Sequence, residues 1–222
     1  MLISKSKNFL FIHIPKTAGT SINEMLNNYA IPKNKNLIRR VSSYFPVREN
    51  IDKAYFRAHP KALSVSKKIG KKEFDKFFKF SVVRNPYDHA VSYYHFLKKN
   101  PDSKRHSESQ SWTFEDAISY LERKNKILPV NQTSWLVNKE GIFIVDKVLF
   151  FENISTEIKE LFKLLKIDPC SIPHKNSTKR KSFRSYYNED LKSRVKNLYA
   201  KDFDNFGYCF EKNEATKNPI FI

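Results

Sequence analysis

The stretch Phe9-Leu-Phe-Ile-His-Ile-Pro-Lys-Thr-Ala-Gly-Thr-Ser21 joins an apolar run to a short polar loop and the start of an amphipathic segment. The run from Phe9 to Ile14 has the length and composition of a buried strand, and Pro15 ends it. From Thr20 the apolar residues recur at helical spacing. A strand, a tight loop and a helix N-terminus in this order predict a site for an anion, to which Lys16 adds a full positive charge.

A second unit of the same kind lies at residues 80–94. Phe80 to Val83 has the pattern of a buried strand, and Asn85 and Pro86 are suited to the cap and first position of a helix, with Asp88 as capping partner. We expect further strands at 53–60 and 147–151, and helices at 67–78, 112–124, 155–165 and 188–199. This alternation predicts a single α/β domain over 1–222, a three-layer fold with a mostly parallel central sheet flanked by helices.

An excess of positive charge is the clearest feature of the composition. The chain has 41 Lys and Arg residues but only 23 Asp and Glu residues, which gives a formal net charge of +18. Such a protein attracts polyanions or an anionic ligand, although a lysine-rich solvated surface has the same composition. The N-terminus has no signal-peptide pattern, and no apolar run approaches the roughly 20 residues of a membrane span. We therefore expect a cytoplasmic protein without a membrane span.

The first loop departs from the standard phosphate-binding loop, in which a Gly-Lys pair is followed by Ser or Thr. Here Lys16 precedes Gly19, the one glycine of the loop. From the residues alone, the loop is either an anion site or a capped turn with an exposed lysine.

The same residues, His13-Ile-Pro-Lys-Thr-Ala-Gly-Thr-Ser21, resemble the 5′-phosphosulfate loop of sulfotransferases that use 3′-phosphoadenosine 5′-phosphosulfate (PAPS). The resemblance is to sulfotransferase family 2, the branch that includes the carbohydrate sulfotransferases. Arg84 and Ser92, eight residues apart, resemble the 3′-phosphate motif of that family. Weaker similarities extend over nearly the whole chain, at 132–136, 150–152, 174–180 and 199–208. The resemblance implies the P-loop NTPase-like sulfotransferase fold.

The resemblance also implies roles for individual residues. Lys16 would contact the 5′-phosphosulfate and stabilise charge on the leaving phosphate, and Arg84 and Ser92 would bind the 3′-phosphate. The 5′ end would also be held by residues of the loop and the helix start, namely Thr17, Ala18, Gly19, Thr20 and Ser21. A late basic segment would close over the nucleotide, so that Lys175, Lys179 or Arg180 contacts PAPS. No metal is expected in the chemistry.

Transfer to a hydroxyl requires a base, and histidine is the side chain best matched to neutral pH. Among the six histidines, His59 ends the strand expected at 53–60, at the edge where ligands bind in an open α/β sheet. Related glycan sulfotransferases carry a catalytic histidine in a comparable place, so we predict that His59 is the base. Glu24 and Glu152 are the alternatives.

The leading interpretation is an enzyme that transfers a sulfuryl group from PAPS to a hydroxyl acceptor, in line. The basic character suits an acidic glycan or polysaccharide, and aromatic residues that could stack on sugars, or belong to the core, are Tyr44, Phe45, Trp112 and Trp135. One alternative is a P-loop-type, Mg²⁺-dependent small-molecule kinase, with Glu152 near the metal. The other is a nucleic-acid-binding protein, against which the scattered lysines and the lack of a nucleic-acid motif argue.

Overall fold

The computed structural model describes residues 1–31, 48–56, 59–168 and 180–220. Its contacts divide the chain into two compact units. Unit 1 comprises Met1–Val83, Trp135–Asn176 and Ile220–Ile222, and unit 2 comprises Arg84–Ser134 and Ser177–Pro219. The expectation of one domain over 1–222 stays a prediction.

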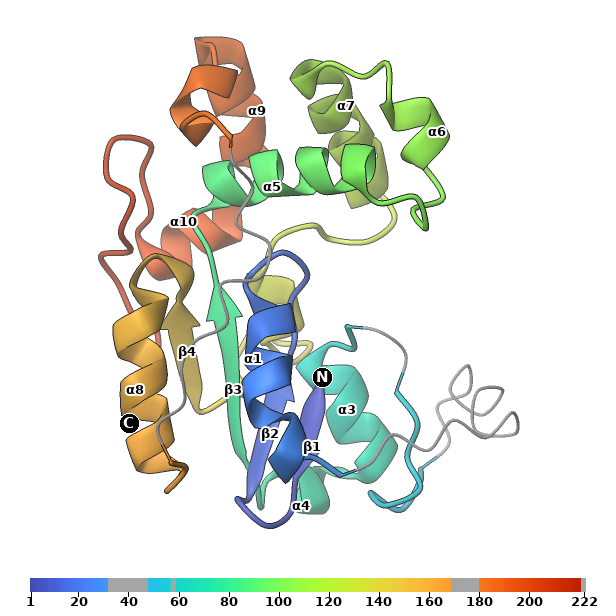
Figure 1. Ribbon diagram of the computed structural model, residues 1–222, viewed down its shortest axis with the longest axis vertical. Helices are drawn as coiled ribbons and strands as arrows, with labels where there is room; N and C mark the ends of the chain where they lie inside the picture. Colours follow the sequence, from blue (N-terminus) through green and yellow to red (C-terminus); the bar gives the residue numbers. More distant parts are fainter. Residues whose placement is uncertain (32–47, 57–58, 169–179, 221–222) are drawn as a thin grey trace. The chain divides into compact units, whose positions relative to one another are not determined.

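Unit 1 contains a four-stranded sheet in the order β1-β2-β3-β4. The strands are β1 (Leu2–Ser4), β2 (Phe9–Ile12), β3 (Phe78–Val83) and β4 (Lys147–Phe150). β1 runs antiparallel to β2, whereas β2, β3 and β4 are mutually parallel (Figure 1). Because the parallel strands share one direction, the loops that follow β2, β3 and β4 all leave from the carboxyl edge of the sheet.

One face of the sheet packs against the helices α1 (Gly19–Leu26) and α8 (Ile154–Leu164). Alternate strand residues point to this face because side chains along a strand have a period of two. The cluster combines the strand residues Phe9, Phe11, Phe80, Val82 and Leu149 with the helix residues Ile22, Met25, Leu26, Ile158, Leu161 and Phe162. This core fixes the start of α1 relative to the end of β2.

The alternate strand residues face the other way, and one of them is a lysine. Lys79 is buried, its ammonium lies 5.4 Å from the ring of Phe74, and it forms a 2.7 Å ion pair with Asp146. Phe74 belongs to α4 (Lys71–Phe74), which follows α3 (Ala62–Ile69). The mostly parallel sheet flanked by helices confirms the predicted α/β fold.

Two predicted elements of unit 1 are wrong. Residues 53–56 and 59–60 are not in a strand; β1, which we did not anticipate, pairs with β2. The helix expected at 67–78 is instead α3 and α4, separated by Gly70, and β3 already begins at Phe78. Gly70 has φ 87°, a backbone conformation that disfavours any side chain, and it lies against the guanidinium of Arg48. A glycine in this conformation interrupts the helical pattern.

Unit 2 is built mainly from helices: α5 (Pro86–Lys99), α6 (His106–Ser109), α7 (Phe114–Asn125), α9 (Glu189–Leu198) and α10 (Ala200–Phe206). α5 begins as the sequence predicts, since the Asn85 side chain accepts a hydrogen bond from the Tyr87 amide at 3.0 Å. α7 has a capping box formed by Thr113 and Asp116. Short 3₁₀ turns complete the two units, at Asn27–Tyr29, Thr133–Trp135, Phe151–Asn153 and Phe183–Tyr186.

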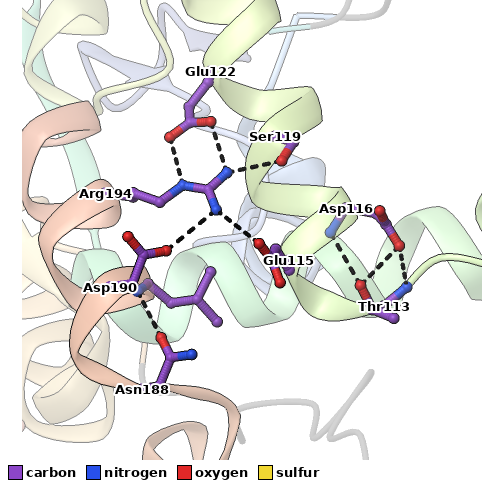
Figure 2. A network of polar contacts seen from close by, with 9 residues as sticks. Thr113, Glu115, Asp116, Ser119, Glu122, Asn188, Asp190 and Arg194 are labelled. Atoms are coloured by element: carbon purple, nitrogen blue, oxygen red, sulfur yellow. Dashed lines mark hydrogen bonds and ion pairs between the residues drawn. The ribbon is translucent and has the colours of Figure 1, made fainter.

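A polar network centred on Arg194 joins α7 to α9 (Figure 2). Arg194 donates to both carboxylate oxygens of Glu122, at 2.9 and 2.8 Å, and to the Ser119 hydroxyl at 2.8 Å. Longer contacts reach Glu115 at 3.3 Å and Asp190 at 3.5 Å. The paired bonds to Glu122 have the geometry in which arginine binds a carboxylate most strongly.

Candidate functional site

The loop after β2 has an unusual backbone. Lys16 has φ 68° and Ala18 has φ 62°, both in the left-handed region that residues other than glycine seldom adopt. Ala18 is the N-cap of α1, and its side chain has no atom that could accept a hydrogen bond from the first turn. The amides of a first helical turn have no acceptor within the helix, and in the described part of the chain no N-cap side chain accepts from them. The loop therefore presents donors and the positive end of a helix dipole to an anion.

The side chain of Thr17 stabilises this loop through a buried hydrogen bond. This side chain is buried, and its hydroxyl donates to the carbonyl of Ile14 at 2.9 Å. Lys16 is half-buried, Thr20 is exposed and Ser21 is buried. The predicted 5′ residues therefore form one continuous segment, with 16–18 in the loop and 19–21 in the first turn of α1.

Gly19 is required here because of a close approach, not because of its φ angle. A Cβ atom at this position would lie 1.8 Å from Nε2 of His13 and 1.9 Å from its Cδ2. The His13 ring is 9% exposed and stacks on Phe11, with ring centroids 5.6 Å apart. On the side of α1, Nδ2 of Asn23 lies 3.3 Å from His13 Nδ1. The imidazole of His13 thus packs directly beneath the start of the loop helix.

His59 lies beside His13, also in unit 1. Its Nδ1 is 3.1 Å from the carbonyl oxygen of His13, and the two rings meet edge to face with centroids 4.3 Å apart. His59 has φ 57°, and its own carbonyl accepts a hydrogen bond from Trp135 Nε1 at 3.4 Å. The structure therefore brings His59 to the residue that precedes the loop, although His59 does not end a strand. The contact with His13 was missed, because the sequence places His13 inside the strand run from Phe9 to Ile14 and does not indicate which distant residue lies beside it.

The second predicted motif begins in unit 2, directly after β3. The backbone of Arg84 is held by Gln132, whose Oε1 accepts from the Arg84 amide at 2.8 Å and whose Nε2 donates to the Arg84 carbonyl at 2.7 Å. Asp202 in turn accepts hydrogen bonds from the amides of Gln132 and Thr133, each at 2.8 Å. Asp202 is fully buried, and this burial raises its pKa to about 6 despite those bonds. Sequence reasoning noted residues 132–136 but assigned no role to Gln132 or Asp202.

The side chain of Arg84 belongs to a buried cluster of three charges. Arg84 Nε donates to Asp88 Oδ2 at 2.8 Å, and Arg84 Nη2 binds the same oxygen. Arg180 Nη2 binds the other carboxylate oxygen, Oδ1. Asp88 therefore pairs with two arginines in place of the capping role that the sequence suggested. Nη1 of Arg180 is buried and has no hydrogen-bond partner in the described part of the chain.

Ser92 lies farther along α5 and is half-buried. It follows Asp88 by one helical turn, so the two residues share a face of the helix. His95 is on the next turn; burial lowers its pKa, and the positive charge of Arg180 lowers it further. The positive charge of Arg180 therefore acts on His95, one turn beyond Ser92 along α5. Arg84, Ser92 and Arg180 gather in unit 2, whereas Lys175 and Lys179 lie outside the described residues.

The two alternative bases occupy different places in unit 1. Glu24 is an exposed residue of α1, and Glu152 is half-buried in the 3₁₀ turn that follows β4. Within the ranges that the structure describes, no group of three or more His, Cys, Asp and Glu side chains is arranged to hold a metal ion. No helix among those residues combines the length and apolar character needed to cross a membrane.

Comparison with known proteins places the chain among enzymes of one kind. Residues 1–209 match the model Sulfotransfer_2, described as the sulfotransferase family. The crystal structure of mouse sulfotransferase SULT7A1 complexed with PAP has a similar fold, with a TM-score of 0.57 at 13% sequence identity, over 92% of this chain and 87% of that chain. No curated protein sequence matches. Because the family model covers nearly the whole sequence, the chain belongs to the sulfotransferase family.

Proposed function

We propose that the protein transfers the sulfuryl group of PAPS to a hydroxyl of a carbohydrate acceptor, with His59 as the base. Membership of the sulfotransferase family supports the reaction class. The mouse enzyme of similar fold is complexed with PAP, the nucleotide that remains when PAPS has given up its sulfuryl group, which supports PAPS as the donor.

Residues 16–21 would hold the 5′ end of the donor. The amides of Thr17 to Ser21 and the hydroxyls of Thr20 and Ser21 would bind its oxygens, and Lys16 would stabilise the charge that develops on the leaving phosphate. The left-handed backbone at Lys16 and Ala18 supports this assignment, because such turns direct successive amides toward one anion.

Arg84, Ser92 and Arg180 would hold the 3′-phosphate, with Lys175 and Lys179 as further contacts. Nη1 of Arg180 supports this assignment: it is buried and has no hydrogen-bond partner among the described residues, and such a donor is costly unless a ligand accepts its hydrogen bond. The carboxyl edge of the sheet gives rise to both the loop after β2 and the segment that continues from β3 into Arg84.

The observation that carries the role of His59 is the 3.1 Å contact between its Nδ1 and the carbonyl oxygen of His13. A carbonyl only accepts, so Nδ1 carries the proton in this contact, and the neutral ring then has its lone pair on Nε2. Nε2 would remove the acceptor's O–H proton while the acceptor oxygen forms a bond to sulfur. The bond between sulfur and the 5′-phosphate oxygen breaks in the same step, and its electron pair stays on the phosphate beside Lys16.

A His59→Asn variant tests the base. Asparagine tolerates the left-handed backbone and can still donate to the His13 carbonyl, but it cannot take a proton at neutral pH. We expect kcat to fall about 10²- to 10⁴-fold, with the Kd for PAP unchanged. His106→Asn is the matched control, since its Nδ1 also lies near a backbone carbonyl, that of Leu97, at 3.4 Å. Full turnover by His59→Asn would transfer the role to Glu24 or Glu152, whose Gln variants can be assayed alongside.

A carbohydrate acceptor is supported by Trp135, which lies beside His59 and has the Lys61 ammonium 5.4 Å from its ring centroid. An aromatic face and a cation next to the base suit an acidic sugar. Trp112 provides the control, because it packs on Tyr120 within unit 2 at 5.3 Å. In a screen of neutral and acidic glycans with labelled PAPS, Trp135→Leu should raise KM for the glycan while Trp112→Leu should not. Turnover of simple alcohols alone would contradict a carbohydrate acceptor.

The choice of donor can be tested before any acceptor is known. PAP should raise the melting temperature, and Arg84→Ala should abolish that shift. Stabilisation by ATP with Mg²⁺ and not by PAP would favour a kinase and contradict the proposal.

A further inference from the structure

Asp88 separates two guanidinium groups that would otherwise repel each other. Its Oδ2 binds Arg84 and its Oδ1 binds Arg180, so each carboxylate oxygen serves one arginine. The three side chains are only 10%, 12% and 13% exposed, for Arg84, Arg180 and Asp88 respectively. We propose that Asp88 is a positioning residue that holds both arginines for the 3′-phosphate and thereby sets the preference for 3′-phosphorylated nucleotides. This inference rests on the function proposed above.

The charge balance of the cluster favours an anionic ligand. Among the described side chains of this cluster, two guanidiniums and one carboxylate leave one positive charge in excess in a largely buried place. Unbalanced charge is costly away from water, and a phosphate would both balance it and accept from the buried Nη1 of Arg180. The carboxylate can remain in place during this binding, because Arg180 reaches it through Nη2 and keeps Nη1 for a second acceptor.

Different residues hold the backbone and the side chain of Arg84. Gln132 holds the backbone of Arg84 on both its amide and its carbonyl, and Asp88 holds the side chain. Arg180 is held at its guanidinium, where Nη2 binds Asp88. Loss of the carboxylate should therefore displace Arg180 more than Arg84.

The helical position of Asp88 also relates the arginines to Ser92. Four residues of α-helix rise about 6 Å, so Asp88 and Ser92 lie on adjacent turns of the same face of α5. The Ser92 hydroxyl would then be a further ligand of an anion bound to the arginines that Asp88 holds. Asp88 positions the two guanidiniums at the place where the third predicted ligand lies.

The test compares PAP with adenosine 5′-phosphate, which lacks the 3′-phosphate, by calorimetric titration. In Asp88→Asn we expect the Kd for PAP to rise about 10- to 100-fold, the range of one charge-assisted contact, while the Kd for adenosine 5′-phosphate stays the same. Asp116→Asn is the matched control, because Asp116 occupies the same third position of α7 and serves there as a capping partner. It should leave both constants unchanged.

Several outcomes would overturn the proposal. Equal weakening of both nucleotides in Asp88→Asn would show a merely structural role, and tighter binding of PAP would show that the carboxylate competes with the phosphate. If Asp88→Asn does not fold, Asp88→Glu keeps the charge but moves it by one methylene group, and the preference for PAP should fall several-fold; an unchanged preference would refute positioning. A wild-type protein that binds PAP no better than adenosine 5′-phosphate would instead refute the nucleotide site itself.

Discussion

Substitution of Gly19 by alanine tests how tightly the anion loop is packed on His13. The added Cβ would lie 1.8 Å from Nε2, whereas ordinary contact begins at 3.4 Å, so the ring would have to retreat by about 1.6 Å (3.4 − 1.8). Phe11 and Asn23 hold the ring in place, and His59 packs on its edge. We expect the free energy of unfolding to fall by about 1–3 kcal/mol, as for other overpacked cores. A displacement of this size beside the proposed base should lower kcat about 100-fold.

The assay combines urea unfolding with turnover of labelled PAPS. Gly141→Ala is the matched control, since Gly141 has φ 82° but nothing within 4 Å of the added Cβ. It should lose about 1 kcal/mol through backbone strain and retain full kcat. His13→Ala in the Gly19→Ala background should remove the clash, so that the double variant loses at least about 1 kcal/mol less stability than the sum of the single variants. Strict additivity, or normal activity in Gly19→Ala, would refute the packing argument.

Three further predictions concern charge. Lys16→Met should lower kcat about 10²- to 10³-fold and weaken PAP binding by less, because the charge on the leaving phosphate that Lys16 stabilises develops in the transition state. Equal losses in kcat and in PAP affinity would contradict a catalytic role for Lys16. Burial raises the pKa of Asp202 from 3.8 to about 6. Between these two pH values the carboxyl keeps its proton in the folded state but has lost it in the unfolded state. Its contribution to the free energy of unfolding should therefore decline by about 3 kcal/mol as pH rises from about 4 to 6, and urea titrations of Asp202→Asn should lack this slope. Arg194→Lys should cost about 1 kcal/mol of the free energy of unfolding, because it loses the paired bonds to Glu122. Arg105→Lys, in the exposed pair with Glu108, should leave the free energy of unfolding nearly unchanged. Equal losses in the two variants would show that the network is no stronger than a surface pair.

Much of the fold could be predicted because its signals are local. The buried strands β2, β3 and β4 contain the apolar runs expected at residues 9–14, 80–83 and 147–151, although β3 begins two residues earlier, and Asn85 with Pro86 marks the start of α5. β1 was missed because three residues are too few to show a period. The prediction of a strand at 53–60 was wrong because composition alone does not decide pairing. The aromatic residues of this segment suit a strand, but the segment that pairs with β2 at the edge of the sheet is β1.

The sequence by itself determined the family resemblance and nominated the residues of the two motifs, from Lys16 to Ser21 and at Arg84 and Ser92. Such motifs can be recognised because one loop or one helix turn sets their geometry, so the relevant spacing is contiguous in the chain. Only the tertiary structure decided the supporting contacts: His59 with His13, Arg180 with Asp88, and Gln132 with Asp202, which join residues 46, 92 and 70 positions apart. Nothing local in the sequence encodes such pairs. They form because the packed sheet and helices bring distant segments together, and only then does a carbonyl, a carboxylate or an amide acquire its partner.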